Sequence, residues 1–126
     1  MPDLAAAEAF YTRAFPLRVT RRFGTAGAEL SGWPAKVYLL EKAAGTTGAG
    51  DQPRRYERHW CPVHLDVIVE DVEAALEQAL AAGATVDTPL RFDVWGRIVT
   101  LADPFGHGLC LIQFLNRGYD EIAPPL

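Results

Sequence analysis

The chain has 126 residues, of which 49% are hydrophobic, enough to bury one core but too few for two independent ones. A formal net charge of −4 excludes the basic surface that proteins need to bind the phosphate backbone of nucleic acids. The N-terminus lacks the basic start of a signal peptide and no apolar run approaches the roughly 20 residues that span a bilayer, so we expect a cytoplasmic protein without membrane contact.

The first half of the chain predicts one helix followed by strands. Residues 3–14 are rich in helix formers, and their apolar members recur at the three-and-four spacing of a buried helical face. Asp3 is a natural N-cap, and Pro16 ends the helix because its ring clashes with the preceding turn. Alternating or β-branched runs then predict strands at residues 17–23, 29–32 and 36–40.

Glycines and small polar residues without an apolar period fill residues 43–58, which indicates an exposed linker. We therefore divide a single domain into module one at about residues 1–45, a linker at about 46–60, module two at about 61–116 and a tail at 117–126 that we expect to be extended. The two cysteines, Cys61 and Cys110, lack a CxxC spacing, so we expect reduced thiols.

The second half predicts a strand, a helix and three more strands. Alternation marks residues 63–69 as a strand, and Asp71 and Gly83 are the start and stop signals of the helix between them. Further strands are predicted at residues 85–86, 98–102 and 109–114, the last two joined by the turn sequence Asp103-Pro104-Phe105-Gly106.

The two halves form a weak internal repeat. Placing Asp3-Leu4 over Asp71-Val72 aligns one capped helix with the other, and each helix is followed by strands. Module two opens with a strand before its helix, whereas module one begins at the helix itself. We therefore expect that the first strand of module one is missing from this sequence and that Met1 occupies an interior strand position.

Three segments resemble a known superfamily: DLAAAEAFYTRAF, VHLDVIVEDVEAALEQALAAGATV and GRIVTLADPFGHGLCLIQF. Together they cover most of the chain and look like the vicinal-oxygen-chelate pattern of glyoxalases, bleomycin-resistance proteins and extradiol dioxygenases. The WGR stretch before the final hairpin is similar to an uncharacterised glyoxalase-like branch. The resemblance implies an α+β fold with two βαβββ modules, whose curved mixed sheets face a common cleft, and a homodimer.

Two polar residues on the strand at 63–69 are candidates for the site. Period-two alternation places His64 and Asp66 on the concave side, opposite an aliphatic face that packs on the helices. By resemblance, His64 stands where metal-dependent members carry a ligand, and Asp66 would be an acid–base or orienting group. The alternative for His64 is a hydrogen-bonded histidine that lines an apolar pocket.

On the last strand, the same alternation turns Cys110 and Ile112 toward the pocket and Leu109 and Leu111 toward the core. By resemblance, Cys110 replaces a glutamate ligand of metal-using members; its alternative role is a small buried hydrophobe. The matching pocket position of module one is Tyr38 or Leu40, neither of them a good ligand. With His64 and Cys110 as the only donors, the sequence predicts that metal binds no tighter than micromolar.

Trp95 and Arg97 lie two residues apart, so we expect them to project together toward the cavity as a stacking face beside a guanidinium. The alternative is that Trp95 caps the core edge while Arg97 extends to solvent. His107 follows the turn and is expected at the surface.

The resemblance leaves two functions open. The first is a small-molecule enzyme, a lyase, isomerase or dioxygenase, that uses a divalent metal (zinc, iron or nickel) to chelate vicinal oxygens of its substrate. The second is a metal-free protein that sequesters an aromatic or antibiotic-like molecule. His64 and Asp66 favour the enzyme, and the loss of a ligand at Cys110 favours the binding protein.

Overall fold

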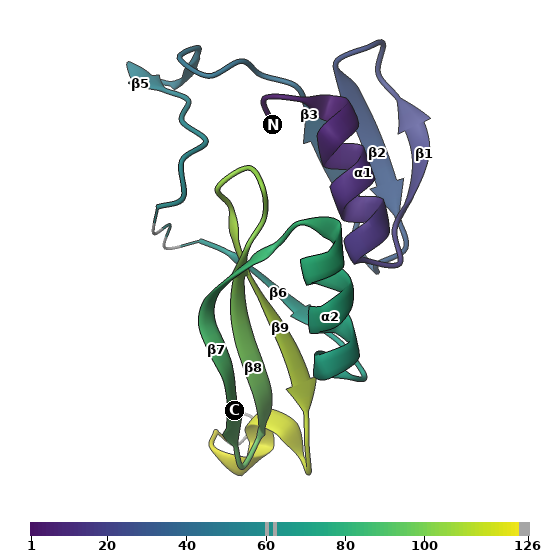
Figure 1. Cartoon of the computed structure of the whole chain (residues 1–126), viewed down its shortest axis with the longest axis vertical. Helices are drawn as coiled ribbons and strands as arrows, with labels where there is room; N and C mark the ends of the chain where they lie inside the picture. Colours follow the sequence, from purple (N-terminus) through teal and green to yellow (C-terminus); the bar gives the residue numbers. More distant parts are fainter. Residues whose placement is uncertain (60, 62, 124–126) are drawn as a thin grey trace.

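Two helices and three open sheets make up the computed structural model, which describes residues 1–59, 61 and 63–123 (Figure 1). The predicted linker end at Trp60 and the last three residues of the tail lie outside the described residues. The elements are α1 (Leu4–Ala14), β1 (Arg18–Arg22), β2 (Gly27–Ser31), β3 (Val37–Leu40), β4 (Thr47–Ala49), β5 (Gln52–Pro53), β6 (Leu65–Ile68), α2 (Val72–Ala82), β7 (Thr85–Asp93), β8 (Gly96–Ala102), β9 (Gly108–Phe114) and the 3-10 helix η1 (Gly118–Glu121).

Aspartates cap the first turn of both helices, as the sequence predicts. The Asp3 carboxylate accepts a hydrogen bond from the backbone of Ala6 at 2.9 Å, and Asp71 accepts from two backbone amides of the first turn of α2. At its other end α2 stops at Gly83, whose φ of 112° lies in the left-handed region that favours glycine. The capped ends fix both helices where the sequence places them.

The sheets give the α+β fold that the resemblance implies. The strand order of the first sheet is β1-β2-β3 and that of the second is β6-β9-β8-β7, with β6 and β9 parallel. Each helix packs on its own sheet, and the two helices contact each other (Figure 1). Module two is thus a complete βαβββ unit, whereas among the described residues no strand precedes α1.

A pair of matching hydrogen bonds supports the internal repeat. The Met1 nitrogen donates to the Leu40 carbonyl at 2.9 Å, and the Val69 nitrogen donates to the Ile112 carbonyl at 2.8 Å. Met1 and Val69 each stand three residues before the first residue of their helix. Met1 therefore takes the position in module one that Val69 takes at the end of β6 in module two.

The core lies between the helices and the sheets. One cluster of buried residues includes Phe10 of α1, Val72 of α2 and Leu111 of β9, so both modules contribute to it. A second, small cluster lies on the opposite face of the second sheet and contains Trp95, Cys110 and Ile112. The predicted alternation along the last strand is therefore confirmed.

Strand β7 is longer than predicted, running from Thr85 to Asp93 and not only over residues 85–86. Pro89 interrupts the sequence pattern because proline cannot donate to a ladder of hydrogen bonds. The structure accommodates it because β7 is the edge strand and its register shifts between Thr88 and Arg91. A local reading of the sequence therefore ends this strand too early.

Two other segments differ from expectation. The predicted linker contains a small exposed hairpin, β4 with β5. The tail, expected to be extended, folds into η1, and the Tyr119 ring packs 4.9 Å from that of Trp95. That aromatic contact explains why the tail folds back onto the second sheet.

No helix in the described part of the chain is long and apolar enough to cross a membrane.

Candidate functional site

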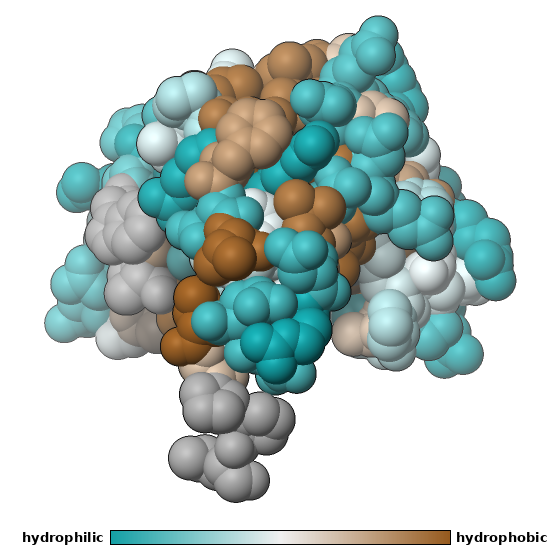
Figure 2. Space-filling view, turned by 90° about the horizontal axis from the view of Figure 1, so that it is seen from below, coloured by the Kyte–Doolittle hydropathy of each residue, from teal (hydrophilic) through white to brown (hydrophobic). Residues whose placement is uncertain are grey.

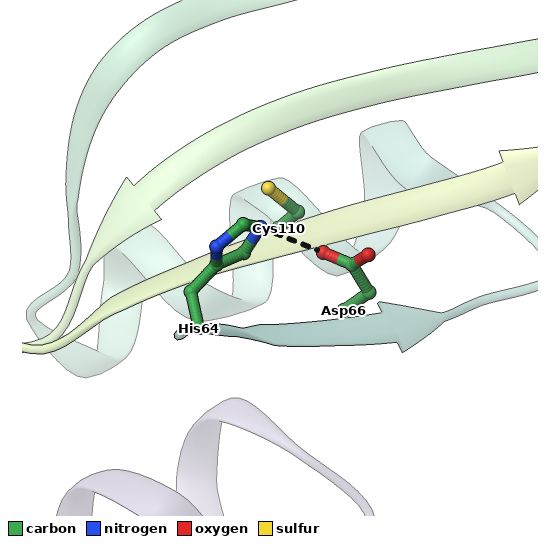
Figure 3. Close-up of side chains that lie close together, drawn as sticks. All are labelled: His64, Asp66 and Cys110. Atoms are coloured by element: carbon green, nitrogen blue, oxygen red, sulfur yellow. Dashed lines mark ion pairs between the residues drawn. The ribbon is translucent and has the colours of Figure 1, made fainter. Parts of the chain in front are cut away.

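Three side chains with metal-ligating atoms converge on the concave face of the second sheet: His64, Asp66 and Cys110 (Figure 3). Their ligand atoms all lie within 4.8 Å of one another. The imidazole Nε2 of His64 is 3.2 Å from a carboxylate oxygen of Asp66. The structure thus brings together three of the residues that the sequence singles out, and we call His64, Asp66 and Cys110 the triad.

The register of two parallel strands produces this convergence. Asp66 on β6 lies opposite Cys110 on β9, although 44 positions separate them in the numbering (110 minus 66). His64 stands two residues before Asp66, so the period-two alternation of an extended chain turns both side chains to the same face. Alternation along the chain places His64 and Asp66 on one face of the sheet, and the pairing of β6 with β9 brings them close to Cys110.

The site is closed on the cysteine side and open on the other. Cys110 is buried, whereas the side chains of His64 and Asp66 are 33% and 48% exposed. Burial raises the pKa of the Cys110 thiol; a contact with the Thr100 hydroxyl at 3.6 Å lowers it, and the Asp66 carboxylate raises it further. The thiol is therefore protonated at neutral pH unless a cation replaces its proton.

The donor set suits a zinc ion. Imidazole nitrogen, carboxylate oxygen and thiolate sulfur are the three kinds of ligand that Zn²⁺ takes in proteins. Catalytic zinc sites use three protein ligands and keep one position for water or substrate, which matches three donors with an open side. The sequence counts only His64 and Cys110 as donors, and the structure adds Asp66.

Aromatic rings border this site. Trp95 is buried, with its ring 4.9 Å from that of Tyr119 and 6.4 Å from that of Phe114. Burial raises the pKa of the Tyr119 hydroxyl, and the Asp66 carboxylate and the Cys110 thiol raise it further. Tyr119 therefore brings a protonated hydroxyl to the Trp95 ring, which packs in one cluster with Cys110, on a segment that the sequence predicts to be extended.

The structure does not bring Arg97 to the same face as Trp95. Arg97 lies toward α2, with its guanidinium 3.7 Å from the Glu73 carboxylate and 5.0 Å from the centre of the Phe92 ring. The expected pairing fails because Trp95 is in the turn between β7 and β8, where the alternation of a strand does not apply. Val99, two residues after Arg97 on β8 and therefore on the same face of the strand, belongs to the core on the α2 side.

Tyr38 and His64 line a shared cavity of about 420 Å³, which is bounded by residues of both modules. The Tyr38 hydroxyl donates to the buried Glu29 carboxylate at 3.2 Å, and this contact holds the ring in place along the cavity wall. The cavity also reaches α1 at Tyr11 and the final hairpin at Phe105. Module one thus contributes a wall to the cavity and, among the described residues, no ligand atom to the triad.

His107 is half exposed, as expected after the turn, and it also lines this cavity. Its ring nitrogen Nδ1 lies 2.9 Å from the buried Asp103 carboxylate, to which the Tyr11 hydroxyl donates at 2.8 Å. Burial opposes ionisation of Asp103, but the hydrogen bonds from His107 and Tyr11 outweigh it and lower the pKa of this carboxyl. The network ties α1 to the final hairpin.

Three residues at the site were not predicted from the sequence: Thr100, Arg91 and Tyr119. Thr100 is paired with Cys110 across β8 and β9, and Arg91 is paired with Ile98 across β7 and β8. A hairpin register counted outward from the turn sequence at residues 103–106 would have found Thr100. Neither Arg91 nor Tyr119 has such a local signal.

Comparison with known proteins identifies relatives of the chain. The profile of the glyoxalase-like domain matches residues 1–112. An uncharacterized protein of Mycobacterium tuberculosis H37Rv is 51% identical over 63 residues, which are 48% of this chain and 37% of that protein. A counterpart in Mycobacterium bovis has the same identity over 41% of its length. The match thus spans well under half the length of these curated relatives.

Solved structures share the fold at low identity. A glyoxalase/bleomycin resistance protein/dioxygenase family enzyme from Burkholderia phytofirmans has a TM-score of 0.69 and 17% identity, over 91% of this chain and 93% of that one. A genomically encoded fosfomycin resistance protein from Listeria monocytogenes has a TM-score of 0.67 and 18% identity, over 91% and 87% of the two chains. These neighbours confirm the fold of the vicinal-oxygen-chelate superfamily.

Proposed function

Because this chain belongs to the glyoxalase-like domain family, we propose that it is a small-molecule enzyme whose reaction depends on a divalent metal held by His64, Asp66 and Cys110. The observation that carries this proposal is the convergence of the three ligand atoms within 4.8 Å. Zinc is the metal that this mixture of nitrogen, oxygen and sulfur donors favours.

In the proposed reaction, different residues of the site have different roles. A zinc ion, when bound, supplies a Lewis acid and a template for two neighbouring oxygens of the substrate. His64 offers its imidazole nitrogen, and Cys110 must give up its proton to serve as a ligand. The Tyr119 hydroxyl, whose ring packs on Trp95, stays protonated and can donate a hydrogen bond to a substrate oxygen. Trp95, Phe114 and Ile112 exclude water from the closed side.

The aromatic cluster favours a second candidate, a metal-free binding protein. Trp95, Phe114 and Tyr119 pack ring to ring beside the triad, and 39% of Phe114 and 44% of Tyr119 remain exposed. Exposed aromatic faces beside Cys110 can stack on a planar ligand without any metal. In this alternative His64 and Asp66 form a hydrogen-bonding pair for the ligand.

Elemental analysis separates the two candidates. Protein purified without added metal is expected to carry about one zinc per chain, because three converging donors make a site that survives dilution. The measurement is inductively coupled plasma mass spectrometry on protein dialysed without chelator, with the double variant Asp66→Asn, Cys110→Ser as the control. Zinc at equal amounts in both proteins, or in neither, contradicts the metal-dependent enzyme.

We further propose that the chain pairs as a homodimer. Seen from the end that carries the turn between β7 and β8, the surface shows hydrophobic residues among hydrophilic ones (Figure 2). Phe92 and Val94 lie at the turn between β7 and β8, and Ile122 follows η1, whose Tyr119 packs on Trp95 of the same turn. All three are more than half exposed, and exposed apolar side chains at one end of a molecule are typical of an interface. Sedimentation equilibrium is expected to give twice the 13.8 kDa of one chain. A species of 13.8 kDa at micromolar concentration contradicts this expectation.

A further inference from the structure

A second cavity, of about 200 Å³, adjoins the triad. His64 and Cys110 both line it, so a ligand in this cavity touches two of the three donor residues. Ile98 and Leu109 provide apolar walls. The described residues that line it include two arginines and no carboxylate; the nearby Asp66, 3.2 Å from the Nε2 of His64, is not among them.

One of the two arginines is already paired. The Arg58 Nε donates to the Asp87 carboxylate at 2.7 Å, which neutralises its charge and fixes its position. Its guanidinium packs over Gly108, where a Cβ would lie 2.7 Å from Nη2. Arg58 therefore forms a rigid part of the wall that contributes little net charge.

Arg91 carries the remaining charge. It forms no ion pair or hydrogen bond with any other described residue, and it lines the same cavity as Cys110. Cross-strand pairing with Ile98, and of Ile98 with Ile112, places Arg91 on the concave face. A guanidinium on a cavity wall that has no partner among the described residues can bind a carboxylate with two parallel hydrogen bonds.

We propose that this cavity binds a carboxylate of the ligand on Arg91, with the rest of the ligand reaching past Ile98 toward His64 and Cys110. The inference rests on the proposed small-molecule site and names the chemical class of its ligand: a small carboxylate with a short apolar body. Arg58 shapes the cavity, and Thr100 supplies a hydroxyl beside it. A neutral ligand of the same shape would leave the charge of Arg91 uncompensated.

The test compares benzoate with its neutral analogue benzamide on the full chain, by ¹H NMR line broadening in the presence of one equivalent of zinc. Benzoate is expected to bind the unmodified protein at least about tenfold more tightly than benzamide, since hydrogen bonds to charged groups exceed neutral ones by that order. Arg91→Gln should abolish this difference and leave benzamide binding unchanged. Arg91 is exposed on an edge strand, so we expect the Arg91→Gln variant to fold like the unmodified protein.

The matched control is Arg21→Gln, which removes an exposed arginine of β1 in the other module and should keep the preference for benzoate. Equal benzoate affinity in the Arg91→Gln variant and the unmodified protein overturns the carboxylate site, as does benzoate binding no tighter than benzamide. Zinc content of each variant is measured in parallel. If the protein binds no zinc but still binds benzoate in an Arg91-dependent way, the carboxylate site is supported, and the lack of bound zinc contradicts only the metal-dependent function.

Discussion

Replacing His64 by alanine is expected to weaken zinc binding by at least about 100-fold. Loss of a residue that merely orients a ligand typically costs 10- to 100-fold in affinity, and His64 is itself one of only three donors in the triad. The two donors that remain, Asp66 and Cys110, resemble the two-donor site for which the sequence alone predicts binding no tighter than micromolar. Competition titration against a chromophoric chelator measures both affinities.

His59→Ala is the matched control for this variant. His59 lines the same 420 Å³ cavity as His64, but it is not among the three residues whose ligand atoms converge. Its removal should leave zinc affinity unchanged. Equal losses in both variants would show that zinc binds elsewhere, and no loss in either would remove His64 from the ligand set.

Asp103→Asn is expected to lower the free energy of unfolding at pH 7 by about 3 kcal/mol, because it removes a buried carboxylate that accepts several hydrogen bonds. Both oxygens of Asp103 are used: one accepts from the Tyr11 hydroxyl and lies beside the His107 ring, and the other accepts from backbone amides of the turn. Urea denaturation followed by circular dichroism measures the change.

The effect of Asp103 should also depend on pH. Its pKa is lower in the folded chain than the usual value of about 3.9, so the folded state favours the ionised form. The stabilisation is fully present above the unfolded pKa and is lost as the pH falls through the folded pKa. The difference between the unmodified protein and Asp103→Asn is therefore expected to shrink below about pH 4.

Tyr11→Phe separates the carboxylate from one of its donors. It removes a single hydrogen bond from the network and should cost about 1 kcal/mol, with the pH dependence retained. A loss in Asp103→Asn no larger than that in Tyr11→Phe, or a difference that persists unchanged at pH 3, would show that the carboxylate does not hold the final hairpin to α1.

The sequence by itself determined the elements whose signals are local. Capping by Asp3 and Asp71 and the stop at Gly83 depend on bonds between residues two to four positions apart, so both helices follow from the printed residues. The faces of Cys110 and Asp66 follow from alternation within one strand for the same reason. These signals, with the resemblance, were enough for the fold.

Only the tertiary structure decided which of these residues meet. Asp66 comes to lie beside Cys110 because β6 pairs with β9 in parallel, and no local pattern fixes the register of strands so far apart in the chain. The side chains of Trp95 and Arg97 lie on different faces of the sheet because Trp95 is in a turn, where the alternation of a strand does not apply. Tyr119 reaches the site because aromatic packing on Trp95 folds the tail back. Each depends on contacts between distant segments, whose energies a linear sequence does not display.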